Sequence, residues 1–227
     1  MEDCQDDLNR RLGTINADEA ILDVIGAISD CGSYLPYAPD YGTAAVTAFA
    51  TVGGVKCGIV ANDYSVDGGA ITGDAACKMT SFLSICDDYG LPVVTLVNSR
   101  GPAASLNVDA VKTLAYAYAT LEVPQVTVIL GHAIGAAFTL MGSKSLGAEL
   151  VYTLDGAEIG VLPASSAVAF AWNGEITQET TREQLEEKWR TSVSTASAAA
   201  STGEVDDIIA PAELRARIAS ALLMLTC

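Results

Sequence analysis

The chain has 227 residues, half of them hydrophobic, and its 12 basic and 28 acidic residues give a formal net charge of −16. At this length a folded chain buries roughly 70% of its extended surface, so one domain with a sizeable core is expected. The acid excess repels phosphate backbones and anionic lipid headgroups, and it therefore disfavours nucleic-acid and membrane-surface binding.

A single histidine, His132, and six dispersed cysteines limit the metal and redox chemistry. One histidine cannot build a histidine-rich centre, and no two cysteines stand in a C-x-x-C arrangement, so we expect no metal and free thiols. The acidic N-terminus lacks the apolar segment of a secretory signal. The longest nearly apolar run, residues 126–142, is too short to span a membrane. These features predict a cytoplasmic protein without direct membrane insertion.

The first segments predict an arm, a helix and a β-hairpin. Residues 1–15 are polar and acidic, so we expect an arm that frays or faces a partner, ahead of one domain over residues 16–227. A helix is expected from Asn16 to Cys31-Gly32-Ser33. Its apolar face is predicted to comprise Ile21, Leu22, Ile25 and Ile28. Gly53-Gly54 then separates two strand-like runs, residues 45–51 and 55–62, as in a tight hairpin.

Helices and buried strands alternate in the rest of the chain. Further helices are expected over residues 71–89, 107–121, 135–146 and 178–200, and a closing helix from Pro211 with Leu214, Ile218 and Leu222 buried. Strands are expected over residues 91–97, 125–130, 150–153 and 205–209. Strands that alternate with helices form βαβ crossovers, so the predicted fold class is α/β with a mainly parallel sheet.

The densest group of small residues follows the strand predicted to end at Leu130. It reads Gly131-His132-Ala133-Ile134-Gly135-Ala136-Ala137 and opens a helix. Backbone N–H groups in a first helical turn have no intrahelical partner, and small side chains let a ligand oxygen approach them. An oxyanion hole can be built from main chain in this way. Close packing of the helix on the sheet accounts for the same residues, and the spacing alone favours that reading.

Several segments, in order over roughly residues 17–225, match a known family. Among them are Gly58-Ile59-Val60-Ala61-Asn62, Val123-Pro124-Gln125-Val126-Thr127-Val128-Ile129, Met141-Gly142-Ser143-Lys144 and Gly203-Glu204-Val205-Asp206-Asp207. In these segments the chain resembles the C-terminal half of the carboxyltransferase component of biotin-dependent acyl-CoA carboxylases and decarboxylases, of the propionyl-CoA and methylmalonyl-CoA type. The resemblance implies a crotonase-like (ClpP-like) ββα spiral.

The resemblance also implies a division of labour. In the family, the N-terminal half binds the acyl-CoA, and the C-terminal half binds carboxybiotin and polarises its ureido oxygen through backbone N–H groups. It therefore implies a CoA-binding half on a separate chain, a biotin carrier protein, and a homo- or hetero-oligomer. The paired donors fall on Ala136 and Ala137, with Gly135 allowing the turn, and Ala136 stands where the family usually has glycine.

The loops depart from the family pattern. After the predicted strand that ends at Val97 the family has an acidic residue and Pro-Gly-Phe, whereas this chain has Asn98-Ser99-Arg100-Gly101-Pro102. Arg100 suits either bidentate binding of a carboxylate or a surface position over a helix end. The candidates for substrate binding are Ser99, Arg100, Gly101 and Thr139, the last at a position that varies with substrate in the family.

Two other functions compete with carboxyl transfer. A serine hydrolase needs a nucleophile at the turn, but Ala136 and Ala137 stand there and no G-x-S-x-G motif occurs. His132 accordingly suits a structural or substrate-facing role better than that of a general base. The second alternative is a non-catalytic scaffold subunit, because a half that has lost its loop residues can still dock a partner and a biotin carrier. We expect that residues 1–227 do not work alone.

Overall fold

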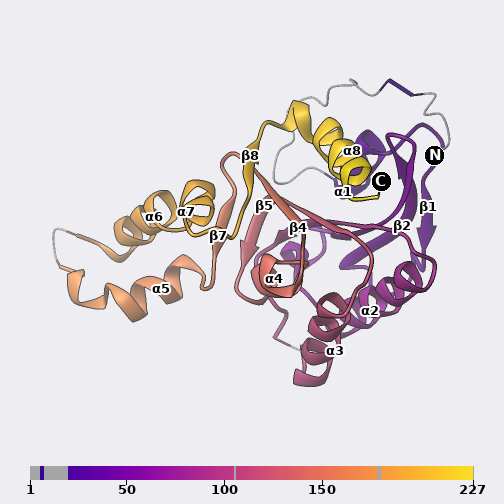
Figure 1. Cartoon of the computed structure of the whole chain (residues 1–227). Coiled ribbons are helices and arrows are strands. Elements are labelled where there is room, and N and C mark those ends of the chain that lie inside the picture. The colour runs from indigo at the N-terminus through magenta and orange to yellow at the C-terminus, as the bar shows by residue number, and fades with distance from the viewer. Residues whose placement is uncertain (1–5, 8–19, 105, 178–179, 227) are drawn as a thin grey trace.

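The computed structural model describes residues 6–7, 20–104, 106–177 and 180–226. Within these residues an eight-stranded sheet lies between two layers of helices, and a helical arm extends to one side (Figure 1). The expected acidic arm, residues 1–15, falls outside the described residues except for Asp6 and Asp7. The carboxylate of Asp6 accepts a hydrogen bond from Cys31 N at 3.0 Å, next to the first helix.

The sheet is antiparallel at one edge and parallel elsewhere, as the crossovers predicted. Its order is β1-β2-β3-β4-β5-β6-β8, and β7 pairs in parallel with the end of β5. Strands β1 to β3 are antiparallel neighbours, whereas β3, β4, β5, β6 and β8 run parallel. The strands are β1 (Leu35–Tyr37), β2 (Ala45–Val52), β3 (Val55–Asn62), β4 (Val93–Ser99), β5 (Gln125–Ile134), β6 (Leu150–Leu154), β7 (Glu158–Gly160) and β8 (Asp207–Ile209).

Each face of the sheet packs on its own set of helices. One face packs on α2, α3 and α4, and the other packs on α1 and α8, so two hydrophobic clusters form the core. Strands β4 and β5 are buried along nearly their whole length because both faces are covered. The helices are α1 (Ile21–Ile28), α2 (Gly73–Asp88), α3 (Val108–Ala119), α4 (Ala136–Leu140), α5 (Ala164–Ala171), α6 (Arg182–Ser192), α7 (Ala196–Ser201) and α8 (Leu214–Leu225).

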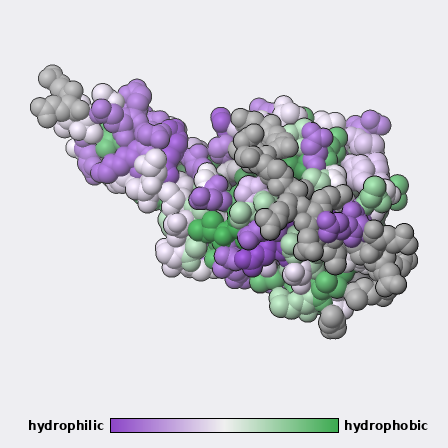
Figure 2. All heavy atoms as spheres, turned by 90° about the horizontal axis from the view of Figure 1, so that it is seen from above, coloured by the Kyte–Doolittle hydropathy of each residue, from purple (hydrophilic) through white to green (hydrophobic). Residues whose placement is uncertain are grey.

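The arm consists of α5 and α6, which lie side by side and extend away from the sheet (Figure 1). The rings of Trp172 and Trp189 meet edge to face with centroids 4.8 Å apart, and Leu185 of α6 is buried. Thr181 and Gln184 form a capping box that fixes the start of α6. Figure 2 shows that the surface of the arm is mostly hydrophilic.

The structure corrects four expected elements. The helix expected over residues 178–200 is wrong: α6 and α7 are separate, because Ser194 between them is buried and its carbonyl accepts the N–H of Ile159. Leu22 is 54% exposed, and Val24 takes its place on the buried face of α1. Ile71 precedes α2 and forms a bridge with Pro102.

The fourth correction concerns the turn after β5. The strand continues to Ile134 instead of ending at Leu130, and the helix expected over residues 135–146 shrinks to the five residues of α4. The helix stops because Gly142 has a φ of +61° and lies against the buried Thr127, where a Cβ atom would come within 2.7 Å of the Thr127 hydroxyl.

Candidate functional site

The candidate site lies at the edge of the sheet where the parallel strands β4, β5 and β7 end. Ser99 at the end of β4 pairs with Ala133 of β5, and His132 pairs with Glu158 of β7. In open α/β sheets, ligands bind outside the carboxyl ends of the strands. Asn98, the second-last residue of β4, is buried, and its amide oxygen accepts the N–H of His132 at 3.0 Å.

The turn into α4 is made by Gly135, whose φ of +60° and ψ of −128° favour glycine. Its N–H donates to Gly160 O at 2.8 Å. Ala136 and Ala137 are the first two residues of α4, where backbone N–H groups lack an intrahelical acceptor. In the described part of the chain the non-glycine residues with positive φ are Ala38 and Asp67, so alanine occupies position 136 without that strain.

The four residues predicted to bind substrate lie in different environments. The Ser99 hydroxyl is buried and hydrogen-bonds to the backbone two residues on. It accepts a hydrogen bond from Gly101 N at 3.1 Å and donates one to Gly101 O at 3.2 Å. A Cβ atom on Gly101 would lie 3.4 Å from Ile134 O, so this loop packs on the end of β5. Arg100 is exposed beside this loop. Thr139 is exposed on α4, and its carbonyl accepts the Ser143 hydroxyl at 2.8 Å.

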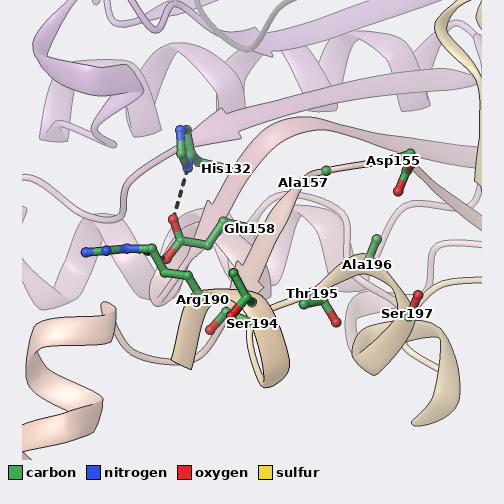
Figure 3. A pocket seen from close by; sticks show the side chains of 11 residues that line it. His132, Asp155, Ala157, Glu158, Arg190, Ser194, Thr195, Ala196 and Ser197 are labelled. Carbon is green, nitrogen blue, oxygen red and sulfur yellow. Dashed lines mark ion pairs between the residues drawn. The ribbon is translucent and has the colours of Figure 1, made fainter. Parts of the chain in front are cut away.

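A row of side chains crosses this edge, and we call it the charged row: Arg100, Tyr64, His132, Glu158 and Arg190. The Arg100 guanidinium lies over the Tyr64 ring at 5.4 Å, and the Tyr64 and His132 rings stack at 5.4 Å with an interplanar angle of 16°. His132 Nδ1 is 3.5 Å from Glu158 Oε2, and Glu158 Oε1 is 3.9 Å from Arg190 Nε. Figure 3 shows His132, Glu158 and Arg190 facing one another.

Two open pockets flank the charged row and share His132, Glu158 and Arg190. The larger, about 610 Å³, continues along α6 and α7 (Figure 3). The smaller, about 410 Å³, is bounded in addition by Arg100, Ile134, Pro163, Ala164 and Ser165. The site therefore offers cations, the carboxylates of Glu158 and Asp155, and short apolar walls within one concave surface.

Sequence reasoning missed Tyr64, Glu158 and Arg190. Glu158 stands in a three-residue strand too short to show an alternating pattern, and Arg190 belongs to a helix whose many charges look like ordinary solvated surface. The one signal that the sequence offered for this group of side chains was His132, because the single histidine of the chain is a position where ionisable groups can meet. Over the described residues, no group of three or more His, Cys, Asp or Glu side chains is placed to hold a metal ion.

The family model for the carboxyl transferase domain matches residues 16–226. The chain belongs to the carboxyl transferase domain family. The match takes in the turn at Gly135 and the charged row. Nowhere in the described ranges is a helix both long and apolar enough to cross a membrane.

Members of the carboxyl transferase domain family with known names are similar over nearly the whole chain. The methylmalonyl-CoA carboxyltransferase 12S subunit of Propionibacterium freudenreichii subsp. shermanii is 37% identical over 90% of this chain and 41% of its own length. The methylmalonyl-CoA decarboxylase subunit alpha of Propionigenium modestum is 34% identical over 98% of this chain and 46% of its own. The chain thus spans less than half the length of these relatives.

Solved structures give the same result for the fold. The crystal structure of a transcarboxylase 12S hexamer with hydrolysed methylmalonyl-coenzyme A bound aligns with a TM-score of 0.87 and 33% identity, over 100% of this chain and 46% of that one. The β subunit of a geranyl-CoA carboxylase from P. aeruginosa aligns with a TM-score of 0.79 at 19% identity, which bears on the fold alone. The predicted crotonase-like α/β fold and the resemblance to half of such an enzyme are confirmed.

Proposed function

We propose that this chain is the carboxybiotin-side half of a biotin-dependent carboxyltransferase or decarboxylase, and that a separate chain supplies the CoA-binding half. The observation that carries the proposal is the turn at Gly135, which has positive φ and starts α4 at the strand edge of a carboxyl transferase domain. The family resemblance supports a second domain of similar fold, and we place it on a partner chain in a homo- or hetero-oligomer. We place the complex in the cytoplasm.

The main-chain donors of the turn suit the ureido oxygen of biotin. The backbone N–H groups of Ala136 and Ala137 are oriented by the start of α4, and both side chains are small enough for a planar ring to approach. Carboxybiotin, held on its carrier protein, supplies the carboxyl group when it is bound. The role of the two N–H groups is to stabilise negative charge on the oxygen that faces them, and the role of Gly135 is to aim them.

The loop after β4 belongs to the substrate side in this proposal. The buried Ser99 hydroxyl and the φ of +126° at Gly101 hold the loop against β5, and Arg100 presents its guanidinium beside it. Thr139 extends the candidate surface along the exposed side of α4. The acyl-CoA itself is assigned to the partner half, as the family resemblance implies, so this acidic chain needs few cations for the CoA phosphates.

The test is a reconstituted complex with Ala136→Pro and Ala136→Gly. Proline is tolerated at a first helical position but removes the N–H, whereas glycine keeps it and restores the residue usual in the family. We expect Ala136→Pro to lower kcat by about 10²- to 10³-fold and Ala136→Gly to retain activity. A complex that assembles normally and shows the same rate with Ala136→Pro would favour the scaffold alternative.

A gentle pull-down from the native cells identifies the partners before that assay. A chain of similar fold and an avidin-reactive carrier are expected to co-elute, and native mass spectrometry gives their stoichiometry. Elution of this chain with copies of itself alone would contradict the split arrangement.

A further inference from the structure

Arg100 is held in place from two sides. Its backbone N–H donates to Gly68 O at 3.1 Å, and its side chain passes over Gly68, where an added Cβ would lie 3.6 Å from Arg100 Cδ. The guanidinium then rests over the ring of Tyr64 at 5.4 Å. An arginine fixed in this way loses less conformational freedom on binding a ligand than a mobile surface arginine does.

A second feature of Arg100 is its lack of an acidic partner within the described ranges. No carboxylate in the described part of the chain forms an ion pair with it, whereas Arg190 faces Glu158, Glu186 and Glu187 at 3.9, 3.7 and 3.3 Å. This contrast is informative in a chain with 28 acidic and 12 basic residues, where carboxylates are abundant. A planar guanidinium with free donors matches a carboxylate in two parallel hydrogen bonds.

The pocket of about 410 Å³ beside Arg100 suits a small acid. Ile134, Pro163 and Ala164 give it short apolar walls. Helix α5 begins at Ala164 in this wall and has no side-chain cap at its N-terminus. The partial positive charge of that helix end adds to the positive potential that Arg100 creates in the pocket. Among the described residues that line this pocket, Glu158 is the one carboxylate, and its ion pairs are with His132 and Arg190 and not with Arg100.

We propose that Arg100 binds the carboxylate of a short-chain malonate-like group in this pocket, and that Tyr64 positions the guanidinium. The assignment rests on the proposed function, since it names the substrate chemistry of that site. The carboxylate has two possible sources, a free carboxylate on the acyl group or the carboxyl carried by biotin. Tyr64 is a positioning residue, because it acts through Arg100.

The single histidine makes direct binding measurable on the chain alone. In tag-free protein labelled at the histidine ring, one NMR signal reports on His132. We expect methylmalonate to shift this signal saturably, and dimethyl methylmalonate and biotinamide, which lack a carboxylate, to leave it unmoved. Arg100→Gln is expected to weaken binding at least about tenfold, and Arg100→Lys by less, since lysine keeps the charge but not the fork.

Variants at Tyr64 test whether its ring positions the Arg100 guanidinium or only contributes to the stability of the fold. Tyr64→Phe keeps the ring face and is expected to bind like the wild type, whereas Tyr64→Leu is expected to weaken binding about threefold or more. Arg217→Gln removes an exposed cation that does not line the pocket and serves as the control. Equal affinity in wild type and a folded Arg100→Gln variant, or equal shifts with the diester, would overturn the proposal.

Kinetics of the reconstituted complex distinguish the two sources. If Arg100→Gln raises KM for methylmalonyl-CoA and not for propionyl-CoA, the carboxylate belongs to the acyl group. If it lowers both directions of carboxyl transfer equally, the carboxylate is the one carried by biotin. A complex without carboxyl transfer, together with Arg100-dependent binding of methylmalonate, would overturn the proposed function and leave the carboxylate site standing.

Discussion

His132 Nδ1 lies 3.5 Å from Glu158 Oε2, and the two residues are register partners on the parallel strands β5 and β7. The pairing is local to the last residues of β5, because β6 pairs with the earlier part of that strand. The three-residue strand β7 thereby places the carboxylate of Glu158 next to His132. Arg190 of α6 approaches the same carboxylate at 3.9 Å, so the helical arm and the strand edge meet at Glu158.

We predict that Glu158→Gln tightens methylmalonate binding about three- to tenfold. The substitution keeps the shape of the side chain but removes a negative charge from the pocket that Arg100 lines, so a bound anion is repelled less. Glu187→Gln is the matched control, since Glu187 also faces Arg190 but lies outside both pockets. The histidine NMR titration measures both affinities. Weaker binding by Glu158→Gln than by Glu187→Gln would contradict the assignment of the anion to this pocket.

We predict that Gly69→Ala destabilises the fold by more than about 2 kcal/mol and that Gly68→Ala costs about 1 kcal/mol. Both glycines have positive φ, +70° and +63°, in the 3-10 helix η1 (Asp67–Gly69) that supports Arg100. A Cβ atom on Gly69 would come within 2.1 Å of Asn98 O, which is backbone, whereas on Gly68 it meets the flexible Arg100 side chain at 3.6 Å. Urea unfolding of the two variants gives the comparison. Equal losses would mean that η1 does not pack on the end of β4.

The sequence predicted those elements whose signal is local. The strands β4 and β5 are continuous apolar runs, and Gly53-Gly54 marks the hairpin of β2 and β3 by turn chemistry. The helix expected over residues 178–200 failed because the break is imposed from outside: Ser194 O accepts Ile159 N, and Thr195 bridges to Glu158. An Ala/Ser-rich stretch carries no local mark of such a tertiary contact.

The candidate site likewise has one part that the sequence could predict and one part that it could not. The turn at Gly135 was predictable, because a strand end followed by small residues is a local pattern. The charged row was not, since Tyr64, Glu158 and Arg190 reach His132 only after three separate segments have packed together. The sequence left Arg100 open between a carboxylate ligand and a surface charge, and its contacts with Gly68 and Tyr64 became visible only in the structure.

We predict that Arg215→Met lowers the free energy of unfolding by about 3–5 kcal/mol. Arg215 of α8 is fully buried and donates to the carboxylates of Asp30 and Asp6 and to the carbonyl of Asp7, so its loss removes the cation that balances two largely buried carboxylates. Arg217→Met on the same helix is the control, because Arg217 is 45% exposed and its pairs are expected to contribute about 0–1 kcal/mol. Denaturant titrations of both variants measure their losses in the free energy of unfolding. Similar losses for the two variants would show that the Arg215 pairs add nothing beyond a surface contact.

The last prediction concerns alkaline pH. Burial raises the pKa of the Cys57 and Cys86 thiols from 9.0 to about 12, with a further contribution to Cys57 from the neighbouring Cys86. In the unfolded chain these thiols ionise near their ordinary pKa, so their contribution to stability is complete below pH 9 and is lost as the pH rises from 9 to 12. The slope is about 1.4 kcal/mol per pH unit for each thiol.

Urea unfolding between pH 8 and 11 measures that slope, and Cys57→Ala is expected to reduce it, whereas replacing the exposed Cys77 by serine leaves it unchanged. Alkylation of the folded protein at pH 8 provides a second readout. Iodoacetamide is expected to label Cys31 and Cys77, which are exposed, and to spare Cys57 and Cys86, because a protonated thiol without solvent access is a poor nucleophile. Labelling of Cys57 as fast as that of Cys77 would show that this part of the core opens readily under native conditions.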